Sequence, residues 1–386
     1  MFAFQLFYGL PVVVGLAVTL GLDQGTTTAW IFGAFITAAL STVPLAIAFR
    51  EPYLVTSSGP AAVMLASAGA HYGWPAILGV CAVTGLLIIV GGIFGLGRLS
   101  MRLVPLPLVM GLFAGSVLRL ATDAFAQLAS ADAFPPLAAI AGFFLTRLAF
   151  QERVPSTLGA LALGFLATVL SGHAPSGLPL EITGPHLAVP ELNLSAIITL
   201  SVPTLILVVG TGNVQALGFM RSQGYRPRAD LVTVVVGAAT FVGALLGTSP
   251  AGVARQGVAI VGGPEAGPRE VRWAAAVFST VLIGLIAFLS VPATALAFAL
   301  PKGFVATVAG LAIVTSLLDA LRIAFTSRLA YSSFFALVIS FTPFAPLGLE
   351  AAFWGLVGGM VIAFLFERDA LFQELRGEAA PPGPGR

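Results

Sequence analysis

Apolar segments of about 20 residues recur from one end of this chain to the other, and they constrain its fold more than any other feature. A helix rises about 1.5 Å per residue, so such a segment crosses the roughly 30 Å hydrocarbon core of a bilayer. Hydrophobic residues make up 58% of the 386 residues and charged residues only 9%, with a mean hydropathy of +1.01. Soluble domains carry about a quarter charged residues. We therefore expect an all-α polytopic membrane protein, with residues 1–386 forming one integral membrane domain.

The apolar pattern predicts about fourteen transmembrane segments. In the first half they lie near 1–20, 28–49, 59–70, 75–96, 103–121, 134–150 and 155–170. In the second half they lie near 195–219, 230–247, 252–262, 271–290, 303–321, 330–345 and 350–366. Met1 opens directly into apolar sequence, so we expect no secretory signal peptide. The Pro/Gly-rich end of the chain, 371–386, is expected to be a disordered tail.

The distribution of arginine predicts the orientation of these segments. With a cytoplasmic amino terminus, nearly all arginines fall in inner loops or in the tail, and only Arg119, Arg255 and Lys302 lie elsewhere. The longest polar loop, 171–193, contains Glu181 and Glu191 but no Lys or Arg, as expected for an outer loop. We expect a multi-pass protein of the bacterial inner membrane with both termini in the cytoplasm. The small net charge of +2 gives no reason to expect nucleic-acid binding.

Weak internal echoes suggest that the chain is a 7+7 inverted repeat, with copies at 1–193 and 194–370. Pro11 corresponds to Pro203 at an offset of 192, Pro60 to Pro250 at 190, and Gly115 to Gly310 at 195. Because seven crossings is an odd number, the second copy must enter the membrane from the opposite face. Alternating-access transporters use this symmetry.

The third and tenth segments are too short to cross as ordinary helices, and each follows a cluster of Ser, Thr, Gly and Pro. A proline pushes the residue before it toward extended backbone and suits the first turn of a helix, so each cluster predicts an unwound strand that leads into a half-helix. Two half-helix amino ends facing each other near the midplane would offer amide N–H groups to an anion. The candidate binding residues are Ser57, Ser58, Gly59, Ser249 and Gly252. The alternative is a pair of kinks that serve only packing.

Arg255, followed by Gln256, lies in the first turns of the tenth segment and is the most informative single residue. An arginine inside a membrane is costly, so a buried guanidinium suggests a function, and its fork fits a carboxylate. We expect Arg255 and Gln256 to contact substrate. The alternatives are that the arginine snorkels outward or pairs with an acidic side chain.

Polar residues in two further segments are candidates for the same cavity. The eighth segment contributes Thr211, Asn213 and Gln215, and the first contributes Gln5 and Tyr8. Hydrogen bonding between helices explains such residues equally well.

Several kinds of chemistry leave no trace in the sequence. Nearly all acidic residues lie in loops or the tail, and only Asp319 and Glu350 approach helices, away from their centres, so no proton relay is predicted. The histidines have no metal-ligand spacing, the single Cys81 excludes a disulfide framework, and no nucleophile with its base is apparent. We expect no cofactor, no metal and no enzymatic activity. The GxxxG pairs 91/95, 111/115 and 355/359 predict close helix packing.

Stretches spread over nearly the whole chain carry a combined signature. They are VTSSGPAAVML, LVMGLFAGSVLR, TGNVQALGFMRSQGYRPRAD, TSPAGVARQGVAI, GPEAGPREVRW and AAFWGLVGG. Together they resemble the bacterial benzoate:proton symporter family. The resemblance implies the fourteen-helix fold shared with nucleobase and sulfate transporters, with a core domain near 1–97 and 194–291 and a gate domain near 98–193 and 292–370. It also implies proton-coupled uptake of an aromatic carboxylate and a possible homodimer.

The sequence departs from that family around the presumed pocket. Thr211, Gly212 and Asn213 stand where the family usually has Ser-Gln-Asn, the tenth segment is several residues shorter, and it contains Arg255. We therefore expect a secondary transporter that imports a small organic anion such as benzoate, with protons as the coupling ion. The alternatives are a transporter or exchanger for an inorganic anion such as sulfate or for a nucleobase, a passive anion channel and, from another class, a membrane sensor or intramembrane enzyme.

Overall fold

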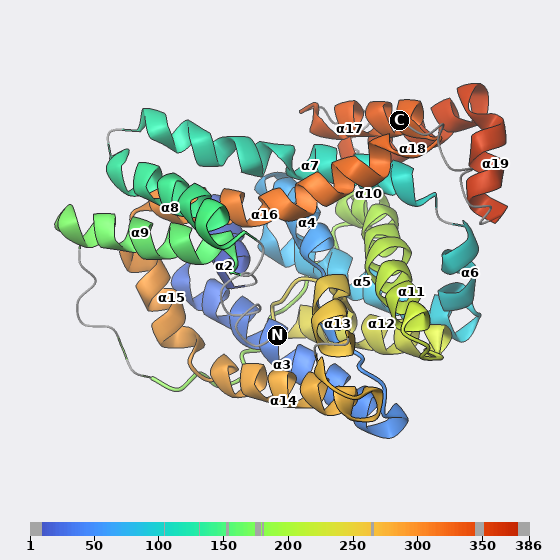
Figure 1. Cartoon of the computed structure of the whole chain (residues 1–386), viewed down its shortest axis with the longest axis horizontal. Helices are drawn as coiled ribbons and strands as arrows, with labels where there is room; N and C mark the ends of the chain where they lie inside the picture. The colour runs from blue at the N-terminus through green and yellow to red at the C-terminus, as the bar shows by residue number, and fades with distance from the viewer. Residues whose placement is uncertain are drawn as a thin grey trace.

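The computed structural model describes residues 10–103, 105–130, 132–151, 154–173, 179, 181–263, 266–343 and 351–376, and these are mostly helical (Figure 1). The first half contains α2 (Leu10–Thr19), α3 (Gln24–Phe49), α4 (Gly59–Tyr72), α5 (Trp74–Ile93), α6 (Leu96–Leu103), α7 (Leu106–Ala126), α8 (Phe134–Phe150) and α9 (Ser156–Leu170). The second half contains α10 (Leu194–Leu205), the π-helix η3 (Ile206–Asn213), α11 (Val214–Ser222), α12 (Ala229–Leu245), α13 (Arg255–Gly262), α14 (Arg272–Ala287), α15 (Ser290–Ala299), α16 (Lys302–Phe325), α17 (Ala330–Phe341), α18 (Ala351–Phe366) and α19 (Arg368–Arg376). Two three-residue strands, β1 (Val55–Ser57) and β2 (Ala251–Val253), lie among the helices.

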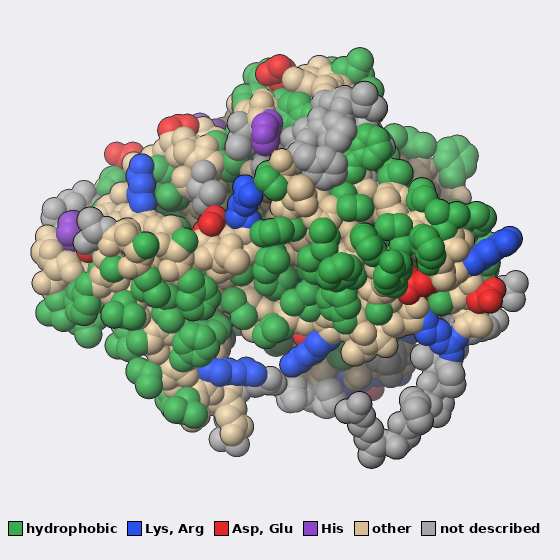
Figure 2. Space-filling model, turned by 90° about the horizontal axis from the view of Figure 1, so that it is seen from above, with side chains coloured by type: hydrophobic (Ala, Val, Ile, Leu, Met, Phe, Trp, Pro, Cys, Tyr) green, Lys and Arg blue, Asp and Glu red, His purple; other side chains and the backbone are tan. Residues whose placement is uncertain are grey.

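The helices have the length and surface of membrane spans. Six described stretches are long and apolar enough to cross a bilayer: Gln24–Phe49, Trp74–Ile93, Leu106–Ala129, Leu194–Arg221, Arg269–Ala287 and Lys302–Phe325. Large apolar side chains such as Leu148 and Phe278 are 81% and 68% exposed. Figure 2 shows hydrophobic side chains spread across one face, with most charged side chains near its margins. A soluble monomer rarely exposes so much apolar surface, so this is a multi-pass membrane protein.

The most extensive helix contacts fall into two sets, and further contacts join these sets. In one set α5 packs on α12 and α3 on α14; in the other α7 packs on α16 and α17, and α17 on α18. These helices lie in the lower and upper parts of Figure 1, respectively. Contacts of α2 with α16 and of α4 with α7 connect the sets. The site described below lies on elements from both sets.

Glycines allow several of these helices to approach closely. A Cβ placed on Gly111 would lie 2.3 Å from the backbone oxygen of Ser333, and one on Gly115 would lie 2.2 Å from that of Leu337, so this GxxxG pair packs α7 on α17 as predicted. Gly95 behaves differently from the prediction. Its φ of 91° lies in the left-handed region, and it forms the turn between α5 and α6.

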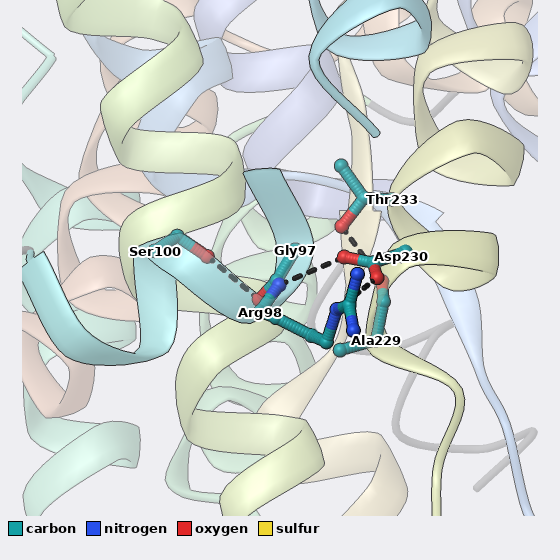
Figure 3. A network of polar contacts seen from close by, with 6 residues as sticks. All are labelled: Gly97, Arg98, Ser100, Ala229, Asp230 and Thr233. Atoms are coloured by element: carbon teal, nitrogen blue, oxygen red, sulfur yellow. Dashed lines mark hydrogen bonds and ion pairs between the residues drawn. The ribbon is translucent and has the colours of Figure 1, made fainter. Parts of the chain in front are cut away.

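Helix α6 was not predicted, because the apolar pattern placed a loop before a span starting at 103. The backbone N–H of Arg98 donates to Oδ1 of Asp230 over 2.9 Å, and its Nε lies 2.5 Å from Oδ2, which attaches α6 to the start of α12 (Figure 3). Gly97 permits this approach, since a Cβ there would lie 2.4 Å from the backbone oxygen of Ala229. Arginine and leucine alternate along α6 at helical spacing, as in a helix at a membrane interface.

Helix α15 was also missed. The sequence pattern ended one span at 290 and began the next at 303, whereas Ser290–Ala299 is helical. Ten residues are too few to span a bilayer, so a search for spans treats the segment as a loop.

The contact between α5 and α12 gives a test of this packing. A Cβ on Gly237 would lie 2.7 Å from the backbone nitrogen of Ile89 and 2.8 Å from the backbone oxygen of Gly85. Gly237→Val should therefore separate the helices and destabilise the protein by about 1–3 kcal/mol, measured as a lower midpoint of thermal unfolding in detergent. The matched control is Gly218→Val on α11, where a Cβ would meet no atom within 4 Å. Equal midpoints for the two variants would contradict tight packing here.

Candidate substrate-binding site

β1 and β2, one from each half of the chain, form a buried antiparallel ladder. Val55 pairs with Val253, Thr56 with Gly252 and Ser57 with Ala251. The ladder is extended at both ends, because Ser58 N–H donates to the backbone oxygen of Pro250 over 2.7 Å and Ala254 N–H donates to that of Leu54 over 3.0 Å. Extended backbone in a membrane interior survives only where its polar groups find partners in the protein. Each strand supplies those partners to the other.

The ladder determines where two helices begin. Strand β1 leads into α4, which starts at Gly59, and β2 leads into α13, which starts at Arg255. Because the strands are antiparallel, the two helices leave the ladder in opposite directions, and both amino-terminal ends face the strands. The first amides of a helix have no partner within the helix and carry the positive end of its dipole. The ladder thus places one positively polarised helix end at each of its two ends.

Two buried threonines hold the strands, and neither was singled out from the sequence. Thr42 on α3 accepts from Val55 N–H over 2.9 Å and donates to the backbone oxygen of the same residue over 3.0 Å. Thr240 on α12 accepts from Ala251 N–H over 3.1 Å, and its hydroxyl lies 3.5 Å from the backbone oxygen of that residue. Each threonine lies on the helix that precedes its strand. A comparison of the two halves of the sequence could have identified these threonines from this shared position.

The predicted serines lie together, because strand pairing brings the two clusters side by side. The hydroxyl oxygens of Ser57 and Ser249 are 3.3 Å apart, and Trp30 Nε1 donates to Ser249 over 3.2 Å. The Trp30 ring stacks on Trp74 with centroids 4.3 Å apart. Ser249 is only 3% exposed, so its hydroxyl serves mainly to connect α3 with the strands.

The two predicted glycines have different surroundings. A Cβ on Gly252 would lie 3.2 Å from the Cβ of Ser58, so this glycine allows the strands to approach. Among the described residues, no atom lies within 4 Å of a Cβ placed on Gly59. These residues therefore leave room for a ligand to approach the backbone at the amino-terminal end of α4.

The eighth segment passes beside β2 as a π-helix. Pro203 lies inside α10, where it lacks the N–H of the α-helical ladder, and the wider η3 begins three residues later. Such π-helical stretches are frequent at functional sites. Asn213 at its end is 2% exposed, and its Oδ1 accepts from Val253 N–H over 3.1 Å. The amide nitrogens of Asn213 and Gln215 are buried without a partner among the described residues.

Arg255 occupies the first position of α13, and its surroundings match the alternative in which it pairs with an acidic side chain. Its Nη2 donates to Oδ2 of Asp319 on α16 over 2.7 Å, and the two side chains are 38% and 37% exposed. The guanidinium is therefore neither buried nor unpaired, and Asp319 belongs to the site rather than lying apart from it. The arginine reaches across to α16 because pairing with a carboxylate lowers the cost of a charge within the membrane.

The remaining predicted residues are only partly described. Gln5 and Tyr8 lie outside the described residues, as do the side chains of Thr211 and Gln256. The structure therefore brings together Ser57, Ser58, Ser249, Gly252 and Asn213 around the ladder, with Gly59 and Arg255 at the two helix ends. Polarised amides, hydroxyls and one guanidinium suit an anion better than a cation or an apolar solute.

The fold resembles that of solved membrane transport proteins. The transmembrane domain of the cyanobacterial bicarbonate transporter BicA superposes with a TM-score of 0.60 at 15% identity, over 90% of this chain and 93% of that one. SLC26A9 superposes with a TM-score of 0.63 at 12% identity, over 93% of this chain and 63% of that one. These likenesses concern the fold.

Residues 8–365 match the family model described as benzoate membrane transport protein, and the chain belongs to that family. Among curated relatives, "Inner membrane protein YdcO" of Escherichia coli strain K12 is 25% identical over 350 residues, 89% of this chain and 88% of that protein. "Benzoate membrane transport protein" of Acinetobacter baylyi is 24% identical over 345 residues, 87% of this chain and 85% of that protein. The family resemblance inferred from the sequence is confirmed.

The threonine contacts lead to a test of how the strands are held. Thr42→Val and Thr240→Val keep the side-chain shape but leave buried backbone groups of β1 or β2 with fewer partners. Each substitution should destabilise the protein by about 1–3 kcal/mol, the usual cost of an unsatisfied buried group. The measurement is the midpoint of thermal unfolding of the purified protein.

Thr42→Ser is the matched control, because it keeps the hydroxyl and should unfold close to the wild type. If Thr42→Val were as stable as Thr42→Ser, the hydroxyl would not hold β1.

Proposed function

We propose that this chain is a secondary active transporter that imports benzoate, or a similar small aromatic carboxylate, together with protons. The family description and the Acinetobacter relative both name benzoate. The bicarbonate transporter that shares the fold also moves an anion. The substrate class is thus supported by relatives in sequence and by a neighbour in fold.

The observation that carries the proposal is the position of Arg255 at the amino-terminal end of α13. A carboxylate placed against this end would meet a guanidinium whose fork matches its two oxygens, together with the polarised amides of the first turn. Ala254, the residue before the helix, has no side-chain group that could cap those amides. A ligand is the partner that would satisfy them.

Transport follows from the way the helices are grouped. The proposed core, near 1–97 and 194–291, contains the ladder with the packed pairs α5/α12 and α3/α14. The proposed gate, near 98–193 and 292–370, contains α7 packed on α16 and α17. Movement of one group against the other would expose the ladder to each side of the membrane in turn. Each group takes one part from each half of the chain, as expected for an inverted 7+7 repeat in which β1–α4 and β2–α13 are the matching half-helix segments.

We place the protein in the bacterial inner membrane with both termini in the cytoplasm. The Escherichia coli relative is named an inner membrane protein, and the arginines gather in the loops that this orientation puts inside.

A second candidate is transport of an inorganic anion. The fold neighbours support it, because one is titled a bicarbonate transporter and another an anion transporter. Such a protein could work as an exchanger or as a passive channel, neither of which needs a proton gradient.

Replacement of Arg255 tests the proposal. Arg255→Gln should lower the uptake of labelled benzoate into proteoliposomes by about 100-fold, the scale expected when one partner of a charge-assisted pair is removed. The abundance of the protein should not change. Arg368→Gln on α19 is the matched control, since it makes the same chemical change outside the ladder, and it should transport like the wild type. Undiminished uptake by Arg255→Gln would remove the arginine from the mechanism.

The same proteoliposomes separate the candidate mechanisms when a pH gradient is imposed. A proton-coupled carrier accumulates benzoate above its outside concentration only when the outside is acidic, after subtraction of the flux into protein-free liposomes. A channel gives no accumulation under either condition. Uptake of bicarbonate or sulfate without uptake of benzoate would favour the second candidate.

A further inference from the structure

The ion pair between Arg255 and Asp319 connects the site to a helix of the other set. Arg255 begins α13 in the proposed core, and Asp319 lies near the end of α16 in the proposed gate. Helix α16 packs most extensively on α7 of the proposed gate and also contacts α2 of the proposed core, so this carboxylate lies on a helix at the boundary between the two groups. In this structure Asp319 therefore pairs with the Arg255 guanidinium. Under the proposed function, the same guanidinium binds the carboxylate of the substrate.

We propose that Asp319 competes with the substrate for Arg255 and is displaced when the substrate binds. This inference rests on the proposed function and deepens it. In the empty carrier Asp319 neutralises Arg255 and connects the core to the gate. In the loaded carrier the substrate carboxylate takes the guanidinium, and that connection is released.

The geometry of the pair suits an exchangeable contact. One hydrogen bond, from Nη2 to Oδ2, joins the two side chains, whereas the strongest arginine–carboxylate pairs are bidentate. Both side chains are more than one third exposed, so an incoming anion can reach the guanidinium without unpacking the helices. An ion pair at this exposure contributes little to stability and can be replaced at low cost.

Asp319 has a second partner ready when it leaves Arg255. The Nη1 of Arg322, one turn further along α16, lies 3.9 Å from the other carboxylate oxygen. Among the described residues, Arg255 and Arg322 are the charged groups within ion-pair distance of Asp319. The displaced carboxylate therefore keeps a cation beside it, and exchange does not strand a negative charge within the membrane.

Measurement of benzoate affinity on purified full-length variants tests this competition. Asp319→Asn keeps the shape of the side chain but removes the competing charge, so it should bind benzoate about fivefold more tightly, by analogy with the energy of a half-exposed ion pair. Asp319→Glu keeps the charge and should bind like the wild type. Asp123→Asn on α7 is the control for charge, because it makes the same change on another gate helix, and its affinity should be unchanged.

The double variant Arg255→Gln/Asp319→Asn should bind no more tightly than Arg255→Gln, because the competition acts through the arginine. If Asp319→Asn is not abundant, Asp319→Ser removes the same charge and gives the same information. Weaker or unchanged binding by the charge-removing variants Asp319→Asn and Asp319→Ser, with binding lost in Arg255→Gln, would overturn the competition and leave the proposed function in place. Unchanged binding in Arg255→Gln would overturn both.

Discussion

The antiparallel pairing of β1 with β2 is the interaction on which the rest of this structure depends. Each strand brings unpaired backbone groups into the interior of a membrane protein, where such groups are costly. The backbone groups of one strand can hydrogen-bond to those of the other only when both halves of the chain meet. The ladder therefore fixes the two halves in register. The threonines at 42 and 240 and the side chain of Asn213 then satisfy the outer edges of the strands. The result is extended backbone at a place where a continuous helix would have left no free amides.

The binding properties follow from that pairing. Helices α4 and α13 begin where the strands end, so their polarised amino-terminal ends are held close to the ladder. Arg255 adds a full charge at one end, and Gly59 leaves space at the other. The ion pair with Asp319 joins this centre to α16. The proposed anion site and the proposed exchangeable ion pair thus share Arg255.

Much of this organisation could be predicted from the sequence, because the length of a membrane helix and the behaviour of proline are local properties. The Ser/Gly/Pro clusters before the third and tenth segments predicted extended backbone next to helix starts. Strand β1 overlaps the first cluster, and β2 begins one residue after the second. What could not be predicted depends on tertiary contacts. Thr42 and Thr240 resemble any threonine in an apolar helix, and the partner of Arg255 lies 64 residues away on another helix. Helices α6 and α15 were missed because they are too short to give the signal of a span, and α19 makes residues 371–376 helical where a disordered tail was expected.

The most direct measurement is the position of a heavy-atom substrate analogue, such as 4-bromobenzoate, in crystals of the protein. Anomalous scattering locates the bromine, and the electron density places the carboxylate. We expect the carboxylate beside the ladder, within hydrogen-bonding distance of the Arg255 guanidinium and of first-turn amides, with Asp319 turned toward Arg322. A carboxylate bound away from both helix ends, with Asp319 still paired to Arg255, would contradict an anion site built on the paired strands.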